Sequence, residues 1–282
     1  KKGRNKKKVM DAGPRDRMFD PKIRRKEMQK ISKWGVEGIK VDFFQGEKQN
    51  TIQLYLDILK DAAKYNLQVV FHGCTIPRGW YRTYPNLLTM EAVRGAELYS
   101  YKPYTRNVVQ FNNIYPFTRN VLGSMDYTPV TFSDYSQDTP HITTNAHELA
   151  LSVIFESGIQ HFADRASSYQ KQPVEVRDYL QKVPVVWDDS FFIDGYPGDL
   201  TILARTRDNE YYFAGINGEM QAKEVEFNLP FLPSDQEYKF QLIKDGKNSR
   251  AFAIDTIQIN QSSKINIKLL PAGGFSARTI RD

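Results

Sequence analysis

The sequence contains one cysteine, Cys74, which excludes an internal disulfide and a metal site built from several thiolates. It has no run of about 18 or more apolar residues, so no segment is expected to span a membrane. Its 17 glycines are too few for a collagen-like chain. With 40% hydrophobic and 26% charged residues, the composition is globular rather than disordered. The length of 282 residues predicts one large or two modest domains.

The net charge of +6 is concentrated at the N-terminus. Residues 1–30 hold 13 Lys/Arg and 4 Asp/Glu, whereas the rest of the chain holds 26 and 29. A basic run such as Lys1–Lys8 can serve as a nucleic-acid or membrane arm. However, no aromatic side chain that could stack on bases interrupts the run, and no apolar segment of a signal peptide follows it. We therefore expect a solvated run, with neither nucleic acid nor membrane as a partner.

Two patterns of hydrophobicity divide the chain near residue 188. Before it, helical patterns alternate with short apolar strands, which predicts βα units and a parallel sheet. After it, strand-like segments separated by turns predict a small all-β sandwich over residues 189–282. Helices are expected at 22–34, 51–65 and 146–156, and strands at 39–44, 67–71, 87–90, 159–162, 200–206, 211–215, 224–227, 238–243 and 265–269.

The first part, residues 1–188, holds too few strands for a complete barrel. We count about five or six, whereas a closed (β/α)₈ barrel usually needs about 250 residues. Either the sheet is open, or the chain is part of a larger protein. The strand-like segment Lys8–Met10, close to the first residue, favours the second explanation.

Polar residues follow the expected strands at their carboxyl ends, where α/β barrels keep their active sites. Lys40 and Asp42 are two residues apart, so they face the same side of their strand. An ammonium group near Asp42 would keep this carboxylate ionised, as a nucleophile requires, but a strand-end salt bridge explains the pair equally well. His72, followed by Gly73, is a candidate contact for a polar substrate. We do not favour a Cys74 nucleophile with His72 as its base, because no nearby residue would orient the histidine.

Two more acids, Glu91 and Glu97, flank an Arg-Gly turn after the third strand. Together with Asp42 they give three carboxylates at or after strand ends. Two carboxylates are the requirement for glycoside hydrolysis, and a third can bind a hard cation such as calcium. Six aromatic residues between Trp80 and Tyr104 suit a carbohydrate cleft. Ordinary surface acids and buried core aromatics are the simpler alternatives.

Four further residues with polar side chains are considered later in the chain. Arg119 and Asp126 lie in loop-like segments, which makes them candidates for binding a polar substrate. His141 and His147 are six residues apart, a spacing that fits no standard two-histidine metal motif, so we assign them structural roles.

In their order along the chain, these motifs resemble glycoside hydrolase family 97, the bacterial α-glucosidase and α-galactosidase family. The resemblance implies a (β/α)₈ barrel followed by a C-terminal β-sandwich. It also implies a large N-terminal β-sandwich domain before the barrel, so we expect this chain to be the C-terminal portion of an enzyme. The matching segments are Gly38–Phe44, Phe71–Gly73, Arg82–Asn86, Glu91–Glu97, Pro116–Arg119, Met125–Pro129, Phe155–Ser157 and Trp187–Asp194.

The family has two mechanistic branches, and two positions distinguish them. Inverting members carry a glutamate base directly after the strand-end histidine, where this chain has Gly73. Retaining members carry an aspartate nucleophile on the preceding strand, where this chain has Asp42. The resemblance therefore implies a retaining α-galactosidase with Asp42 as the nucleophile and Glu97 as the general acid/base. A retaining pair predicts a carboxylate separation of roughly 5–5.5 Å.

The resemblance also implies a cofactor and substrate contacts. Glu91 and Glu97 would bind calcium, while Lys40 and His72 would contact the sugar of an oligosaccharide or other α-galactoside. Family members usually work in the Gram-negative periplasm, so we expect a periplasmic location. Two alternatives stay open: an α-glucosidase of the same family, and a carbohydrate-binding protein that is inactive as this fragment.

Overall fold

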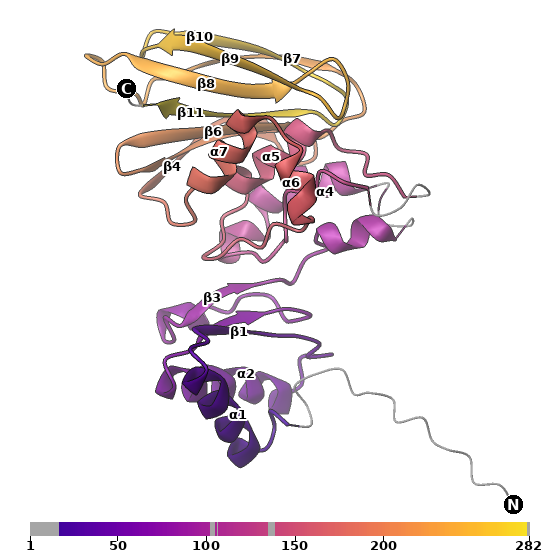
Figure 1. Ribbon diagram of the computed structural model, residues 1–282, viewed down its shortest axis with the longest axis vertical. Coiled ribbons are helices and arrows are strands. Elements are labelled where there is room, and N and C mark those ends of the chain that lie inside the picture. The colour runs from indigo at the N-terminus through magenta and orange to yellow at the C-terminus, as the bar shows by residue number, and fades with distance from the viewer. Residues whose placement is uncertain (1–16, 102–104, 106, 135–138, 281–282) are drawn as a thin grey trace, which may run out of the picture. The chain divides into compact units, whose positions relative to one another are not determined.

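The computed structural model describes residues 17–101, 105, 107–134 and 139–280. The basic run Lys1–Lys8 and the expected strand at Lys8–Met10 lie outside these residues. The chain divides into two compact units (Figure 1). The predicted domain boundary near residue 188 stays a prediction. The first unit comprises Lys1–Val93, Leu122–Asp126 and Ser157–Ile159, and the second Arg94–Val121, Tyr127–Glu156 and Gln160–Asp282.

The first unit contains a parallel three-stranded sheet in the order β1-β2-β3. Its helices α1 and α2 lie on the same side of this sheet (Figure 1). Each strand and both helices are confirmed, with ends that differ from the expected ones by a few residues. The elements are α1 (Pro21–Lys33), β1 (Gly38–Val41), α2 (Gln49–Lys64), β2 (Gln68–Phe71), the 3₁₀ helix η1 (Trp80–Arg82) and β3 (Leu87–Met90).

A buried ion pair joins the two helices of the first unit. Arg24 of α1 donates two hydrogen bonds to Oδ2 of Asp61 on α2, at 2.9 and 2.7 Å. Arg25 donates a third, to Oδ1, at 3.0 Å. Burial alone would raise the pKa of Asp61, but the hydrogen bonds from both arginines outweigh it and lower this pKa. The helices are thereby fixed against each other on the sheet.

The second unit contains a six-stranded antiparallel sheet in the order β4-β5-β6-β11-β8-β9 and a separate pair, β10-β7. A shared hydrophobic cluster, which includes Ile202, Phe213 and Phe275 of the larger sheet and Phe227 and Ile265 of the pair, packs the two together. The strands are β4 (Asp189–Tyr196), β5 (Leu200–Arg207), β6 (Glu210–Asn217), β7 (Lys223–Asn228), β8 (Tyr238–Asp245), β9 (Phe252–Ile259), β10 (Lys264–Leu269) and β11 (Gly274–Ile280).

The opposite face of the six-stranded sheet is covered by α5 (Asn145–Ile154), whose ten residues are all buried. Gly274 permits this close approach, because a β-carbon there would lie 2.7 Å from the α-carbon of His147. Thr144 caps the helix by accepting a hydrogen bond from the His147 amide at 3.0 Å. The unit's other helices are η2 (Ala96–Ser100), α4 (Val108–Ile114), η3 (Tyr115–Phe117), η4 (Asn120–Leu122), α6 (Ala166–Gln170) and α7 (Val174–Lys182).

The described residues thus form an α/β fold with a β-rich C-terminal part, while the closed barrel remains a prediction. The expected helix at 146–156 is confirmed as α5, and all five expected C-terminal strands are confirmed, as β5, β6, β7, β8 and β10. The strand expected at 159–162 is not formed.

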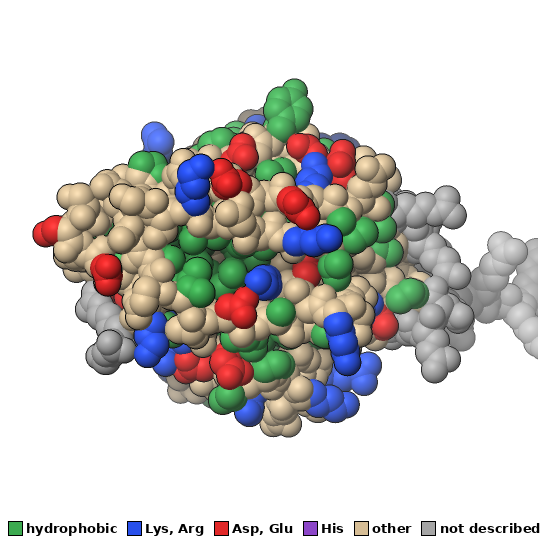
Figure 2. All heavy atoms as spheres, turned by 90° about the horizontal axis from the view of Figure 1, so that it is seen from above, with side chains coloured by type: hydrophobic (Ala, Val, Ile, Leu, Met, Phe, Trp, Pro, Cys, Tyr) green, Lys and Arg blue, Asp and Glu red, His purple; other side chains and the backbone are tan. Residues whose placement is uncertain are grey.

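None of the described helices has the length and apolarity needed to cross a bilayer. Acidic and basic side chains are interspersed on the face shown in Figure 2.

Candidate active site

The candidate site lies at the carboxyl edge of the parallel sheet in the first unit. Strand register brings the ends together, since Val41 lies opposite Phe71, and Phe71 lies opposite Met90. The next residue of each strand is Asp42, His72 or Glu91, so all three predicted site residues emerge at one edge. Asp126 joins them because Met125 forms a parallel bridge with Met90, and the Asp126 amide donates to the Met90 carbonyl at 3.0 Å.

A continuous chain of polar contacts runs through four side chains and ends at one backbone amide. The four side chains are those of Lys40, Asp126, His72 and Glu91. Asp126 is buried, and its Oδ2 lies 2.8 Å from Lys40 Nζ and 2.8 Å from His72 Nδ1. The other ring nitrogen of His72, Nε2, lies 3.2 Å from Glu91 Oε1. Glu91 Oε2 in turn accepts a hydrogen bond from the Gly73 amide at 2.6 Å. The imidazole is therefore fixed in place by a carboxylate at each of its nitrogens.

The charges around His72 favour its protonated form. Burial alone would lower the pKa of His72. The hydrogen bond with Asp126 and the negative charge of Glu91 outweigh burial and the opposing charge of Lys40, so this pKa is raised. An imidazolium donates from both nitrogens, which matches a position between two acceptors.

Asp42 lies against a glycine that leaves it room. Its Oδ1 accepts a hydrogen bond from the Phe43 amide at 2.6 Å, and Phe43 has a left-handed backbone with φ of 64°. A β-carbon at Gly73 would lie 2.5 Å from this same Oδ1 and 2.8 Å from the Phe43 nitrogen. No real β-carbon approaches so closely, so a side chain at position 73 and the present position of Asp42 exclude each other.

Lys40 has a different partner from the one that its spacing suggested. Its ammonium group forms an ion pair with Asp126 and, among the described residues, none with Asp42. The salt bridge considered for Lys40 and Asp42 is therefore not formed. Asp126 was predicted as a substrate contact, and its position between Lys40 and His72 was not foreseen.

The other two predicted site residues belong to the second unit. Glu97 is exposed in the short helix η2, which follows Gly95. A β-carbon at Gly95 would lie 2.5 Å from the Tyr127 carbonyl oxygen, so only glycine fits this turn. Arg119 is buried in the loop directly before η4. The predicted 5–5.5 Å separation between the carboxylates of Asp42 and Glu97 stays a prediction.

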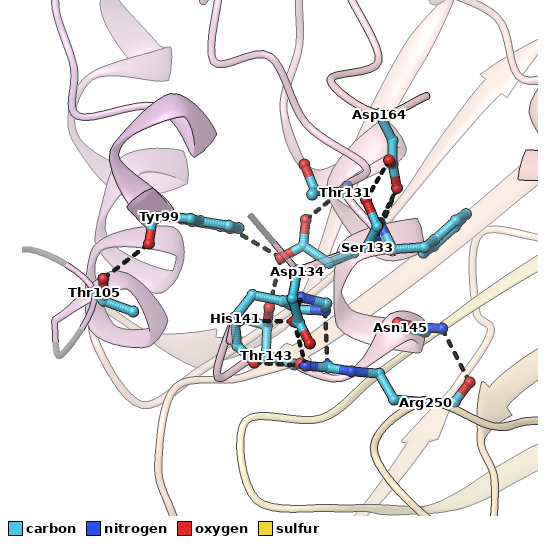
Figure 3. Close-up of polar contacts among 12 residues, drawn as sticks. Tyr99, Thr105, Thr131, Ser133, Asp134, His141, Thr143, Asn145, Asp164 and Arg250 are labelled. Atoms are coloured by element: carbon cyan, nitrogen blue, oxygen red, sulfur yellow. Dashed lines mark hydrogen bonds and ion pairs between the residues drawn. The ribbon is translucent and has the colours of Figure 1, made fainter. Parts of the chain in front are cut away.

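Glu97 also lines a pocket of about 430 Å³ within the second unit, together with Tyr99, Asp134, His141 and other residues. Figure 3 shows the polar contacts of several lining residues, among them Tyr99, Asp134 and His141. His141, to which the spacing assigned a structural role, is buried and forms part of this wall. No motif singles the pocket out, because its residues come from separate parts of the second unit.

The aromatic residues give a mixed result. Trp80 and Tyr84 pack against the hydrophobic core of the first unit, and Tyr99 is buried, as the core alternative predicts. Tyr81 is exposed. Glu91 presents carboxylate oxygens at the strand edge, held in place by a backbone amide. Hard oxygen donors of this kind fit calcium, and the calcium site stays a prediction.

Two sequence models of one family match the chain. The model described as "Glycoside hydrolase 97" matches residues 7–93, and the one described as "Glycosyl-hydrolase 97 C-terminal, oligomerisation" matches residues 186–280. The first includes the candidate site up to Glu91, and the second covers the β-rich tail. The matches therefore lie in both units.

Curated relatives match over most of the chain. It is 35% identical over 248 residues to a probable retaining alpha-galactosidase of Streptomyces bingchenggensis, covering 88% of this chain and 37% of that protein. It is 32% identical over 256 residues to the retaining alpha-galactosidase of Bacteroides thetaiotaomicron, covering 86% and 38%. The chain thus spans less than two fifths of the length of these relatives.

Solved structures align along nearly all of the chain. A crystal structure of a beta-arabinopyranosidase has a TM-score of 0.86 and 32% identity, covering 93% of this chain and 42% of that one. A glycoside hydrolase family 97 enzyme from Pseudoalteromonas sp. strain K8, in complex with panose, has a TM-score of 0.81 and 28% identity, covering 93% and 45%. Sequence models, curated relatives and structures agree, and the chain belongs to glycoside hydrolase family 97.

Proposed function

We propose that the protein cleaves terminal α-galactosides with retention of configuration, Asp42 acting as the nucleophile. The observation that carries this proposal is the contact between Gly73 and Asp42. A glutamate at position 73, as in the inverting branch, would displace Asp42 from its present position. Two relatives described as retaining alpha-galactosidases, one of them as probable, support the same assignment.

The proposed reaction has two displacements. In the first, Asp42 attacks the anomeric carbon while Glu97 protonates the departing glycosidic oxygen, and a β-linked glycosyl-enzyme forms. In the second, Glu97 takes a proton from water, and the water oxygen displaces Asp42 from the opposite face. Each step inverts the anomeric carbon, so the released sugar has the α-configuration of the substrate.

The remaining site residues would bind and orient the sugar. Asp126 holds both Lys40 and His72 in place, and the ammonium group of Lys40 has further N–H donors for sugar hydroxyls. At His72 a sugar hydroxyl would share or replace the contact of Nε2 with Glu91. Arg119 is a further proposed contact. Glu91 and Glu97 would hold a calcium ion, whose positive charge would favour the ionised form of a nearby carboxyl group.

The stereochemistry of the product tests the mechanism. With p-nitrophenyl α-galactoside, time-resolved proton NMR on the full chain should detect α-galactose first, and mutarotation should produce the β-anomer later. β-Galactose as the first product would contradict retention. Galactose binding without any turnover would favour the carbohydrate-binding alternative instead.

Azide rescue tests the roles of the two carboxylates. Asp42→Ala should lose activity, and azide should restore it as β-galactosyl azide, because azide replaces the missing nucleophile. Glu97→Ala should give α-galactosyl azide, since azide then attacks the glycosyl-enzyme. Asp57→Ala, at a solvent-accessible carboxylate on α2, is the control and should retain activity. An α-azide from Asp42→Ala would remove the nucleophile role from Asp42.

A second candidate substrate is a β-L-arabinopyranoside, because a solved beta-arabinopyranosidase aligns with a TM-score of 0.86. This sugar has the ring configuration of an α-D-galactoside and lacks only the hydroxymethyl group at C5. Both substrates therefore suit one set of ring contacts. Values of kcat/KM for the two p-nitrophenyl glycosides decide between them, and we expect the α-galactoside to be preferred.

A further inference from the structure

We propose that the pocket of the second unit lined by Glu97 binds the sugar that departs from the galactoside, and that Asp134 and Arg165 select it. This inference rests on the proposed function. A general acid must touch the oxygen that it protonates, and that oxygen belongs to the leaving group. The leaving group therefore lies beside Glu97, and the pocket on which Glu97 borders is the space for it within this unit.

The size of the pocket suits one sugar or two. Its volume of about 430 Å³ lies within the range of small-molecule sites, which is about 300–1,000 Å³. A flat protein surface would bind a departing sugar weakly, whereas a concave wall can contact several of its hydroxyl groups. The cavity thus offers more than the space needed for an alcohol as small as methanol.

The pocket has an acceptor that is held rigidly in place. Arg250 Nη2 donates to Asp134 Oδ1 at 3.0 Å, and His141 Nδ1 lies 2.8 Å from the same oxygen (Figure 3). Arg250 Nη1 also donates to His141 Nε2 at 2.7 Å. The second oxygen, Asp134 Oδ2, has no hydrogen bond with any described residue, so it can accept one from a ligand hydroxyl.

The pocket also has a donor. Arg165 is exposed, and its guanidinium group makes no hydrogen bond or ion pair with the described residues, although its backbone amide donates to Asp164. The Asp164 carboxylate already accepts three hydrogen bonds from backbone amides and one from the Ser133 hydroxyl, so we do not assign it to a ligand. Arg165 and Asp134 therefore remain as one donor group and one acceptor group for a ligand.

The combination of an acceptor, Asp134, and a donor, Arg165, indicates that the ligand of this pocket is a neutral polyol. The carboxylate of Asp134 repels a phosphate or carboxylate ligand, while the guanidinium of Arg165 disfavours a simple cation. A sugar hydroxyl both donates and accepts, so adjacent hydroxyls can satisfy Asp134 and Arg165 together. A p-nitrophenyl leaving group has no hydroxyl that could donate to Asp134, so it cannot satisfy Asp134 and Arg165 together.

Comparing two leaving groups tests the proposal. In Arg165→Ala, kcat/KM for melibiose, whose leaving group is glucose, should fall about tenfold, and the value for p-nitrophenyl α-galactoside should fall less than threefold. Asp134→Asn should change the same ratio in the same direction. The control Arg177→Ala removes an exposed arginine of α7 and should leave the ratio unchanged. Equal losses on both substrates, or no loss on either, would overturn the proposal.

A binding measurement separates this inference from the proposed function. In a Glu97→Gln background, saturation-transfer NMR reports the two rings of melibiose separately. Adding Arg165→Ala should weaken saturation of the glucose ring and leave that of the galactose ring. Saturation of the galactose ring alone in both proteins would contradict the leaving-group site while supporting galactose recognition. If wild type cleaves neither substrate and neither ring is saturated, the proposed function and this inference both fail.

Discussion

At residue 73, the absence of a side chain allows Asp42, the proposed nucleophile, to occupy its present position. Gly73→Ala would place a β-carbon 2.5 Å from Asp42 Oδ1, so the carboxylate or its backbone must move. A displacement of about 1 Å at a reacting group can cost about 100-fold in rate. We therefore expect kcat/KM for p-nitrophenyl α-galactoside to fall at least about 100-fold in this variant.

Gly35 provides a control that distinguishes the effect of the contact with Asp42 from the effect of backbone strain. Gly35 also has a positive φ, of 80°, but a β-carbon there meets nothing within 4 Å. Alanine at either position should cost about 1 kcal/mol of stability through the unfavourable φ. Only Gly73→Ala should also lose activity. Equal activity losses in the two variants would show that the contact with Asp42 is unimportant.

The residues of the site could be predicted better than their contacts. Strand ends and the family resemblance point to Asp42, His72 and Glu91, and the register brings these three to one edge. The partner of Lys40 could not be predicted in this way. It is Asp126, which is distant in sequence and reaches the edge through a single bridge beside β3.

At the scale of elements, the stability of α5 should depend strongly on its N-terminal cap, Thr144, because the hydroxyl of this residue is buried and makes two hydrogen bonds. Thr144 Oγ1 accepts from the His147 amide and also donates to the buried Asp245 Oδ1 at 2.6 Å. Thr144→Val removes both bonds, so the free energy of unfolding should fall by about 1–3 kcal/mol in urea titrations. Thr144→Ser keeps the hydroxyl and should lose less than about 1 kcal/mol, mainly through the missing methyl group. Equal losses in both variants would rule out the hydroxyl as the cause.

Three strands were not expected from the sequence, and β11 shows the physical reason. It is a central strand buried on both faces, because α5 covers one face and the hydrophobic cluster the other. Small and polar residues such as Ser276 are therefore buried in this strand, and its sequence lacks the alternation of hydrophobic and polar residues that predicts a half-buried strand. In contrast, β4 and β9 are edge strands with many exposed residues, so hydrophobicity marks them weakly.

At the scale of the whole molecule, buried titratable groups set the response to acid. Burial lowers the pKa of His141 to about 4, with the charge of Arg250 adding to the effect, and burial lowers that of His147 to about 3. Burial raises the pKa of Glu148 to about 7, although its hydrogen bonds to Thr143, Thr131 and Tyr99 oppose this. Between about pH 5 and 6, unfolding therefore lets two histidines gain protons and lets one glutamate lose its proton.

Of these three groups, the two histidines outweigh the glutamate, so together they make the unfolded state bind about one proton more, and their contribution to stability should fall by about 1.4 kcal/mol as pH falls from 6 to 5. Burial also raises the pKa of Asp245, which opposes this fall. His147→Gln removes one of the two histidines and should make the free energy of unfolding nearly independent of pH in this interval. Urea titrations at pH 5, 5.5 and 6 measure the slope. Above about pH 7.5 both histidines are neutral in either state, so there the difference between wild type and variant should stay constant. An unchanged slope between pH 5 and 6 in the variant would show that His147 does not stay neutral in the folded protein.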